Sequence, residues 1–162
     1  MQAQQLLQKP AHLTWEESAS YGLTYYTAHR MLVDRAKIQP GQSVLVWGAG
    51  GGLGVFAVQL AAAVGARPIA VVSSPDRAEL CMSLGAVGVI DRSEFPGLPY
   101  RDGMTAAEEA DRVAAVKAFG RRIWEILGER TGVDVVFEHV GKSTFPASVF
   151  LANDFGRIVI CG

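Results

Sequence analysis

The sequence has only two cysteines among its 162 residues, Cys81 and Cys161. Neither belongs to a Cys-x-x-Cys pair nor stands at a histidine spacing typical of zinc ligands, so we expect reduced thiols and no metal site. The sequence also has no excess of charge of one sign. Its 15 basic and 16 acidic residues give a net charge of -1, and no block of like charge occurs. No aromatic and basic residues interleave. These absences argue against a nucleic-acid partner and against an anionic membrane surface.

Long hydrophobic runs are absent as well. No apolar run approaches the roughly 18 residues of a membrane-spanning helix, and the start, MQAQQLLQKP, lacks the charged and then apolar order of a signal peptide. We therefore expect a cytoplasmic protein with no membrane association. What the sequence does have is 49% hydrophobic residues, which is enough at this length to bury a core.

Short β-branched runs alternate with longer helical patterns along the chain. This order predicts an α/β fold, a Rossmann-type doubly wound parallel sheet with helices on both faces and a truncated sixth strand. The expected strands are residues 43–47, 68–72, 87–90, 133–137 and 157–161. The expected helices run from a Thr14 cap to about Val33, from the glycine-rich turn to Val64, from Ser74 to near Gly85, from Thr105 through a bend at Gly120 to Leu127, and over a short span after a Ser143 cap.

The domain organisation follows from these elements. Residues 1–40 predict an N-terminal helix that leads into the domain, and residues 41–162 predict an NAD(P)-binding Rossmann domain. The interval between the third and fourth strands is long for a simple crossover. It predicts an insertion at about residues 93–120.

The stretch VLVWGAGGGLGVFAVQLAAAVGA runs from a strand through a glycine-rich turn into a helix. Such a turn presents backbone N–H groups and the positive end of the helix dipole to an anion. In the register Ala49-x-Gly51-x-x-Gly54, Gly51 would let a pyrophosphate approach the backbone, and Gly54 would let the helix pack closely on the strand. The residues predicted to hold a dinucleotide diphosphate are Ala49, Gly50, Gly51, Gly52, Leu53 and Gly54. The alternative is a turn that binds nothing.

The end of the second strand, AVVSSPDR, discriminates between nicotinamide cofactors. NAD enzymes usually place Asp or Glu there against the ribose 2′-hydroxyl, whereas this chain has Ser73 and Ser74, with Arg77 available as a cation. We therefore favour NADPH. Alternatively, Arg77 belongs to a solvated helix face. Arg92, after the third strand, lies either beside the adenosine phosphate or in solvent.

His139 follows VVFE, at the carboxyl end of the fourth strand, where open α/β sheets bind ligands. Its ordinary pKa suits proton handling or hydrogen bonding to a carboxylate-like group. It could equally be a strand-end histidine that only shapes the pocket.

The stretch GAGGGLGVFAVQLAAAVGA resembles the medium-chain dehydrogenase/reductase superfamily. Within it, HLTWEESASYGLTYYTAHRML, FGRRIWEI and VDVVFEHVGKSTFPASVF are similar to the crotonyl-CoA carboxylase/reductases. The segment between Asp91 and Gly120 resembles the insertion of that subfamily. Tyr21 stands where zinc alcohol dehydrogenases usually carry a ligand cysteine, so the resemblance implies a zinc-independent reductase.

The resemblance implies that NADPH delivers hydride to the β-carbon of a 2-enoyl-CoA and that CO2 is captured at the α-carbon, giving an alkylmalonyl-CoA such as ethylmalonyl-CoA. His139 matches the histidine of that family that helps to hold CO2. The resemblance also implies a homo-oligomer and an upstream GroES-like catalytic domain, and we expect this chain to be the cofactor-binding domain without it. We therefore expect the chain alone to be catalytically inactive.

Two alternatives stay open at this stage. The chain could be the cofactor domain of an enoyl-thioester or quinone reductase that does not carboxylate. It could also be a stand-alone nucleotide-binding module without catalysis.

Overall fold

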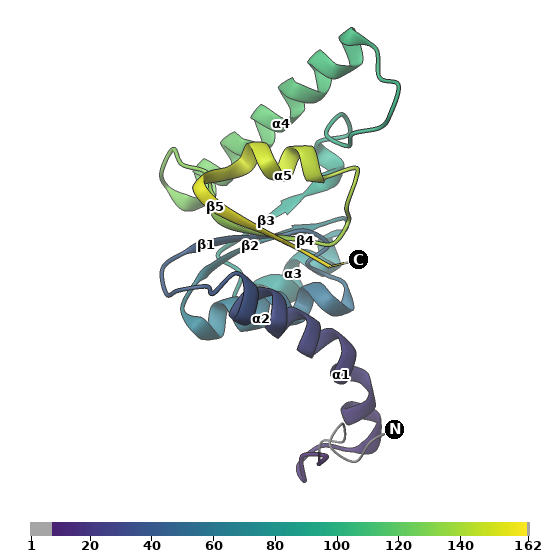
Figure 1. The fold of residues 1–162 in the computed structure, drawn as a ribbon, viewed down its shortest axis with the longest axis vertical. Coiled ribbons are helices and arrows are strands. Elements are labelled where there is room, and N and C mark those ends of the chain that lie inside the picture. The colour runs from purple at the N-terminus through teal and green to yellow at the C-terminus, as the bar shows by residue number, and fades with distance from the viewer. Residues whose placement is uncertain (1–7, 162) are drawn as a thin grey trace.

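The computed structural model describes residues 8–161 and contains one five-stranded sheet with the order β3-β2-β1-β4-β5. Every pair of neighbouring strands is parallel. The strands are β1 (Ser43–Val46), β2 (Arg67–Val72), β3 (Gly88–Asp91), β4 (Val133–Glu138) and β5 (Ala152–Ile160). The α-helices are α1 (Trp15–His29), α2 (Gly52–Val64), α3 (Pro75–Ser83), α4 (Ala106–Leu127) and α5 (Phe145–Leu151) (Figure 1).

Helices cover both faces of the sheet. The helices α1, α2 and α3 lie on one face, and α4 and α5 lie on the other (Figure 1). Alternate residues of β1 supply the two cores: Val44 and Val46 pack toward α2, whereas Leu45 packs with Phe119 of α4. All four residues of β1 are buried, as expected for a parallel strand covered on both sides. The predicted doubly wound α/β fold is confirmed.

The strand order reverses beside β1. The chain winds outward through β2 and β3 on one side, then returns through α4 to place β4 on the other side of β1. Because all strands are parallel, their carboxyl ends meet at one edge, and a crevice opens between β1 and β4, where the connections diverge. The topology therefore brings the carboxyl ends of these two strands, at Val46 and Glu138, to one ligand-binding edge.

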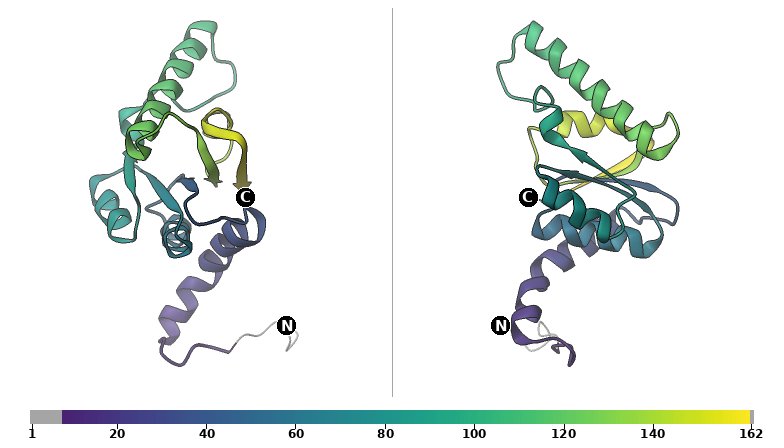
Figure 2. Two further views of the ribbon diagram at one scale, coloured as in Figure 1. Left: turned by 90° about the vertical axis from the view of Figure 1, so that its left-hand side faces the viewer. Right: turned by 180° about the vertical axis from the view of Figure 1, so that it is seen from behind.

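Both predicted capping boxes are present. Thr14 accepts the backbone N–H of Glu17 at the start of α1, and Thr105 accepts that of Glu108 at the start of α4. A π-helical turn, η2 (Arg30–Arg35), extends α1 slightly past the expected end. The helix α4 projects beyond the sheet at its N-terminal end (Figure 2).

Of the helices in residues 8–161, none is both long and apolar enough to cross a bilayer.

Three sequence predictions about element bounds were wrong. The helix α4 is continuous through Gly120, because that glycine is buried beside Leu151 of α5 and serves close packing instead of a bend. The residue before α5 is Thr144, not Ser143, and its hydroxyl binds Glu138 instead of capping the helix. Strand β5 begins at Ala152 instead of residue 157, because Ala152 already pairs with Val133 of β4 before the register shifts ahead of Arg157.

Helix α2 begins directly against the turn that ends β1. A Cβ atom on Gly54 would lie 2.4 Å from the Gly48 carbonyl oxygen and 2.6 Å from the Ala49 Cα atom. These neighbours are backbone atoms, so they cannot rotate away as a flexible side chain could. The close helix-to-strand packing expected at Gly54 is therefore confirmed.

We predict that Gly54→Ala lowers the free energy of unfolding by about 1–3 kcal/mol or more, because the added methyl group overlaps backbone atoms. Urea denaturation of the purified chain measures this. The matched control is Gly52→Ala in the same helical turn, where the nearest atom to a new Cβ is Thr24 Cγ2 at 3.7 Å. Equal stability of the wild-type chain and Gly54→Ala would contradict the packing argument.

Candidate functional site

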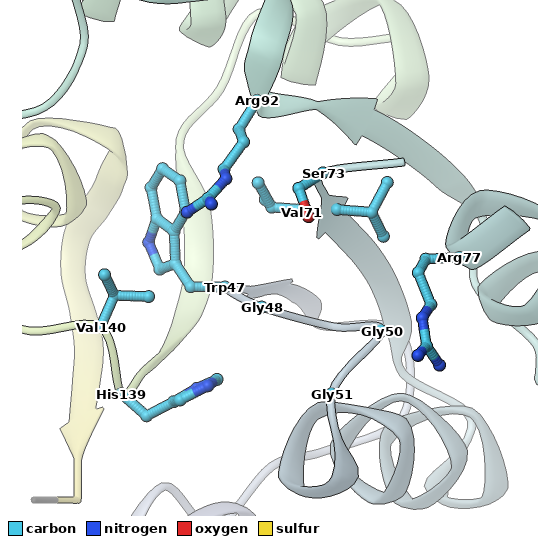
Figure 3. Close-up of a pocket in the computed structure, with 11 residues that line it drawn as sticks. Trp47, Gly48, Gly50, Gly51, Val71, Ser73, Arg77, Arg92, His139 and Val140 are labelled. Carbon is cyan, nitrogen blue, oxygen red and sulfur yellow. The ribbon is translucent and has the colours of Figure 1, made fainter. Parts of the chain in front are cut away.

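A cavity of about 390 Å³ opens at the carboxyl edge of the sheet. It lies above the ends of β1, β2 and β4, with the chain after β3 closing one side (Figure 3). Its lining residues are Trp47, Gly48, Gly50, Gly51, Val71, Val72, Ser73, Arg77, Arg92, His139 and Val140. The cavity therefore occupies the crevice that the strand order creates.

The structure brings together six of the residues predicted from sequence: Gly50, Gly51, Ser73, Arg77, Arg92 and His139 all line this cavity. The other five lie nearby without lining it: Ala49, Gly52, Leu53, Gly54 and Ser74. Ala49 and Gly54 are buried, Leu53 packs against the core beneath α2, and Ser74 precedes α3. Gly52 is exposed at the first position of α2.

The glycine turn already uses part of its hydrogen-bonding capacity. The Ala49 amide donates to the Val71 carbonyl at 3.0 Å, and the Gly51 amide donates to the Gly48 carbonyl at 3.0 Å. Two amides of the stretch predicted to hold a diphosphate, those of Ala49 and Gly51, therefore stabilise the turn itself. The amides of Gly52, Leu53 and Gly54 belong to the first turn of α2 and have no intrahelical partners, so they remain available to an anion.

Two glycines of the turn make room for side chains of the protein itself. Gly48 adopts a φ of +58°, and a Cβ there would lie 2.8 Å from His139 Cε1 and 2.9 Å from its Nε2. A Cβ on Gly50 would lie 2.7 Å from the Cβ of Arg77. The glycines thus let His139 and Arg77 approach the turn from opposite sides, a role that their spacing in sequence did not reveal.

The positive charge of the cavity gathers on the side of β2 and β3. Arg77 and Arg92 are both exposed, and the Arg77 side chain extends past Gly50 toward the start of α2 (Figure 3). The Arg92 side chain reaches across the cavity toward Trp47 (Figure 3), and the exposed Ser73 also lines the cavity. None of the described residues that line the cavity carries a carboxylate. This side of the cavity suits a strongly anionic ligand.

His139 occupies the opposite side, at the end of β4. Burial lowers the pKa of its imidazole below the ordinary value of 6.5, and the neighbouring Glu138 carboxylate opposes this shift. Its Nδ1 is buried and has no hydrogen-bond partner among residues 8–161. The ring is therefore neutral near pH 7, with one N–H donor and one acceptor nitrogen.

Sequence reasoning missed Trp47, Val140 and Glu138. The first two line the cavity, and Glu138 is a fully buried carboxylate directly behind it. The signal for Glu138 was a glutamate at the end of the otherwise apolar stretch VVFE, since an acidic residue is almost never fully buried without partners. Of the cysteines, Cys81 is buried and Cys161 half-buried, and both are free thiols.

No three His, Cys, Asp or Glu side chains in the described part of the chain converge on a geometry that could hold a metal ion. The absence of zinc stays a prediction that rests on the sequence.

We predict that His139 titrates below pH 6.5, because burial disfavours the imidazolium. Its Cε1 proton resonance, followed by NMR against pH, measures this directly. Protonation then destabilises the fold, so the free energy of unfolding falls as the pH drops from about 6.5 through the lower folded-state pKa. The variant His139→Asn removes that part of the pH dependence. A His139 midpoint at or above 6.5 would contradict the burial argument.

Known proteins resemble this chain closely. It is 45% identical to a crotonyl-CoA carboxylase/reductase of Cereibacter sphaeroides, over 99% of this chain and 38% of that protein. It is 47% identical to a crotonyl-CoA reductase of Streptomyces collinus, over 97% of this chain and 34% of that protein. The chain thus spans little more than a third of the length of these curated relatives.

A solved structure agrees with the sequence comparison. The 2-octenoyl-CoA carboxylase reductase CinF, crystallised with NADP and 2-octenoyl-CoA, superposes with a TM-score of 0.85 at 41% identity, covering 99% of this chain and 35% of CinF. The family model described as "Zinc-binding dehydrogenase" matches residues 52–162. The chain therefore belongs to the zinc-binding dehydrogenase family, and within that family it is similar to the crotonyl-CoA carboxylase/reductases over nearly its whole length.

Proposed function

We propose that the cavity binds NADPH. The observation that carries this proposal is the convergence of a helix N-terminus, two arginines and a serine on one cavity whose described lining has no carboxylate. The first turn of α2, after Gly51, would receive the diphosphate. Ser73 and Arg77 would receive the 2′-phosphate, with Arg92 beside the adenosine. The NADP found with CinF supports the same assignment.

The choice of NADPH over NADH rests on charge. A 2′-hydroxyl is usually bound by Asp or Glu at the end of the second strand, but that place holds Ser73. Asp76 lies in the first turn of α3, is exposed and does not line the cavity. A guanidinium can donate several hydrogen bonds to a phosphate in a fixed fork geometry, so Arg77 favours the phosphorylated cofactor.

We further propose that the chain is the cofactor-binding domain, residues 41–162, of a reductive carboxylase. NADPH would supply a hydride for the β-carbon of a 2-enoyl-CoA. His139 would hold CO2 near the α-carbon, because its neutral ring offers one fixed N–H donor to a CO2 oxygen. The half-buried setting of His139 supports this role, since a donor shielded from water binds a weakly polar ligand better. The complete protein would be a cytoplasmic homo-oligomer.

A second candidate function is reduction of the same enoyl-CoA class without carboxylation. The similar protein of Streptomyces collinus is described as a crotonyl-CoA reductase, which favours it. The two candidates differ only in whether CO2 or a proton reaches the α-carbon.

We predict that Arg77→Ala weakens NADPH binding by about tenfold or more, because a charge-assisted contact to the 2′-phosphate is lost. NADH, which lacks that phosphate, should bind almost unchanged. Isothermal titration calorimetry with both cofactors measures the difference. The matched control is Arg121→Ala, an exposed arginine on α4 outside the cavity. Equal losses for NADPH and NADH would overturn the 2′-phosphate assignment.

We predict that the complete protein converts crotonyl-CoA and NADPH to ethylmalonyl-CoA when bicarbonate is supplied, and to the saturated thioester when CO2 is removed. In His139→Asn the product should shift toward the saturated thioester, since CO2 is held less well. Mass spectrometry of the acyl-CoA products measures this ratio. A wild-type product that bicarbonate does not change would favour the simple reductase.

A further inference from the structure

The loop that follows β4 is held from beneath by the Glu138 carboxylate, which is 0% exposed. Its Oε1 atom accepts the backbone N–H groups of Val140 at 2.9 Å and Gly141 at 3.0 Å. The Thr144 hydroxyl lies 2.9 Å from Oε1 and 3.0 Å from Oε2, and the Ser148 hydroxyl donates to Oε2 at 2.6 Å. Two amides and two hydroxyls thus surround one carboxylate.

The buried Ser148 hydroxyl links Glu138, at the end of β4, to Trp47, directly after β1. Because a carboxylate only accepts, the Ser148 proton is directed to Glu138, and its lone pairs stay available. The indole Nε1–H of Trp47 donates to that hydroxyl oxygen at 2.8 Å. The Trp47 ring also stacks on Phe119, with ring centroids 5.3 Å apart. The end of β1 is therefore joined by hydrogen bonds to the end of β4.

Glu138 and Ser148 do not line the cavity, but their bonds fix three residues that do: Trp47, His139 and Val140. His139 and Val140 lie between Glu138 and Gly141, whose φ of +87° completes the turn. Because the two amides that follow His139, those of Val140 and Gly141, are bonded to Glu138, the backbone is held where the His139 ring lies against Gly48. Trp47 is oriented by Ser148 in the same way.

A second carboxylate on β4 shows what a purely structural role looks like. Asp134 accepts from the Ser43 amide at 2.8 Å and the Ser43 hydroxyl at 2.9 Å, and from Asn153 at 3.3 Å. These bonds tie β1, β4 and β5 together at the opposite end of the strand, and none of the three residues lines the cavity. Of these two carboxylates, Glu138 is the one whose bonds reach cavity-lining residues.

We propose that Glu138 is the positioning residue of this site, which holds the His139 ring and the Trp47 indole as the walls of the crevice. A buried carboxylate is costly unless it is fully hydrogen-bonded, and here each of its bonds restrains either the turn after β4 or the serine that orients Trp47. The inference rests on the proposed function only for the identity of the ligand.

The test is Glu138→Gln in the full chain, which keeps the shape and size of the side chain but places an amide N–H₂ among the donors. The direct readout is the NMR cross-relaxation between the His139 Cε1 proton and the Gly48 Cα protons, since His139 Cε1 lies 2.8 Å from the place that a Cβ on Gly48 would take. We expect this signal to weaken or vanish, and NADPH to bind about tenfold more weakly. Asp134→Asn is the matched control and should leave both readouts unchanged, even where it lowers stability.

A second variant keeps the proposal testable if Glu138→Gln does not fold. Ser148→Ala removes the acceptor of Trp47 but retains the bonds from Glu138 to Val140 and Gly141. We expect the Trp47 indole N–H resonance to shift and NADPH affinity to fall, with the His139 to Gly48 signal retained. If Ser148→Ala leaves both the indole resonance and the NADPH affinity unchanged, the proposed positioning of Trp47 through Ser148 is overturned.

The proposal as a whole is overturned if folded Glu138→Gln keeps the His139 to Gly48 signal and the wild-type affinity, or if Asp134→Asn causes equal losses. Failure of the proposed function has a different signature. In that case the wild-type chain binds no NADPH, whereas the proton contact between His139 and Gly48 still reports whether Glu138 positions the ring.

Discussion

The close contact between the start of α2 and the turn after β1 is the constraint on which the site depends. The Gly54 position leaves no space for a side chain, because the Gly48 carbonyl and the Ala49 backbone lie against it. This contact aims the N-terminus of α2 at the carboxyl edge of the sheet. Without it, the unpaired amides of the first helical turn and the dipole behind them would not face the crevice.

The crevice is electrostatically divided. On the side of β2 and β3, Arg77 and Arg92 supply two positive charges and Ser73 a hydroxyl group, whereas on the side of β4 the burial of His139 keeps its ring neutral. A ligand with phosphates at one end and an uncharged reacting group at the other would match this division. The proposed NADPH meets that description, since its phosphates lie on the adenosine side of the molecule and its reduced nicotinamide ring is uncharged.

The polar interior behind the crevice explains how such a division can be held rigidly. Glu138, Ser148 and Trp47 form a chain of hydrogen bonds in which each donor has one acceptor in reach. The strand ends on both sides of the crevice are thereby coupled to one buried carboxylate. Family membership accounts for the shared fold over residues 52–162, whereas the geometry of this network accounts for the shape of the cavity wall.

The sequence by itself determined the elements and much of the site. Alternating apolar runs, two capping boxes and the glycine-rich turn predicted the doubly wound sheet, because periodicity and capping are local properties of the chain. The rule that parallel strands present their carboxyl ends at one edge was enough to group Ser73, Arg77, Arg92 and His139.

Only the tertiary structure decided which groups meet across that edge. Gly48 faces His139, and Trp47 reaches Glu138 through Ser148, which is 101 positions further along the chain than Trp47. The amides of Ala49 and Gly51 are occupied by carbonyls that only the folded turn brings near. Such contacts depend on strand order and side-chain packing, which no local pattern specifies, so burial and hydrogen-bond partners had to be read from the fold.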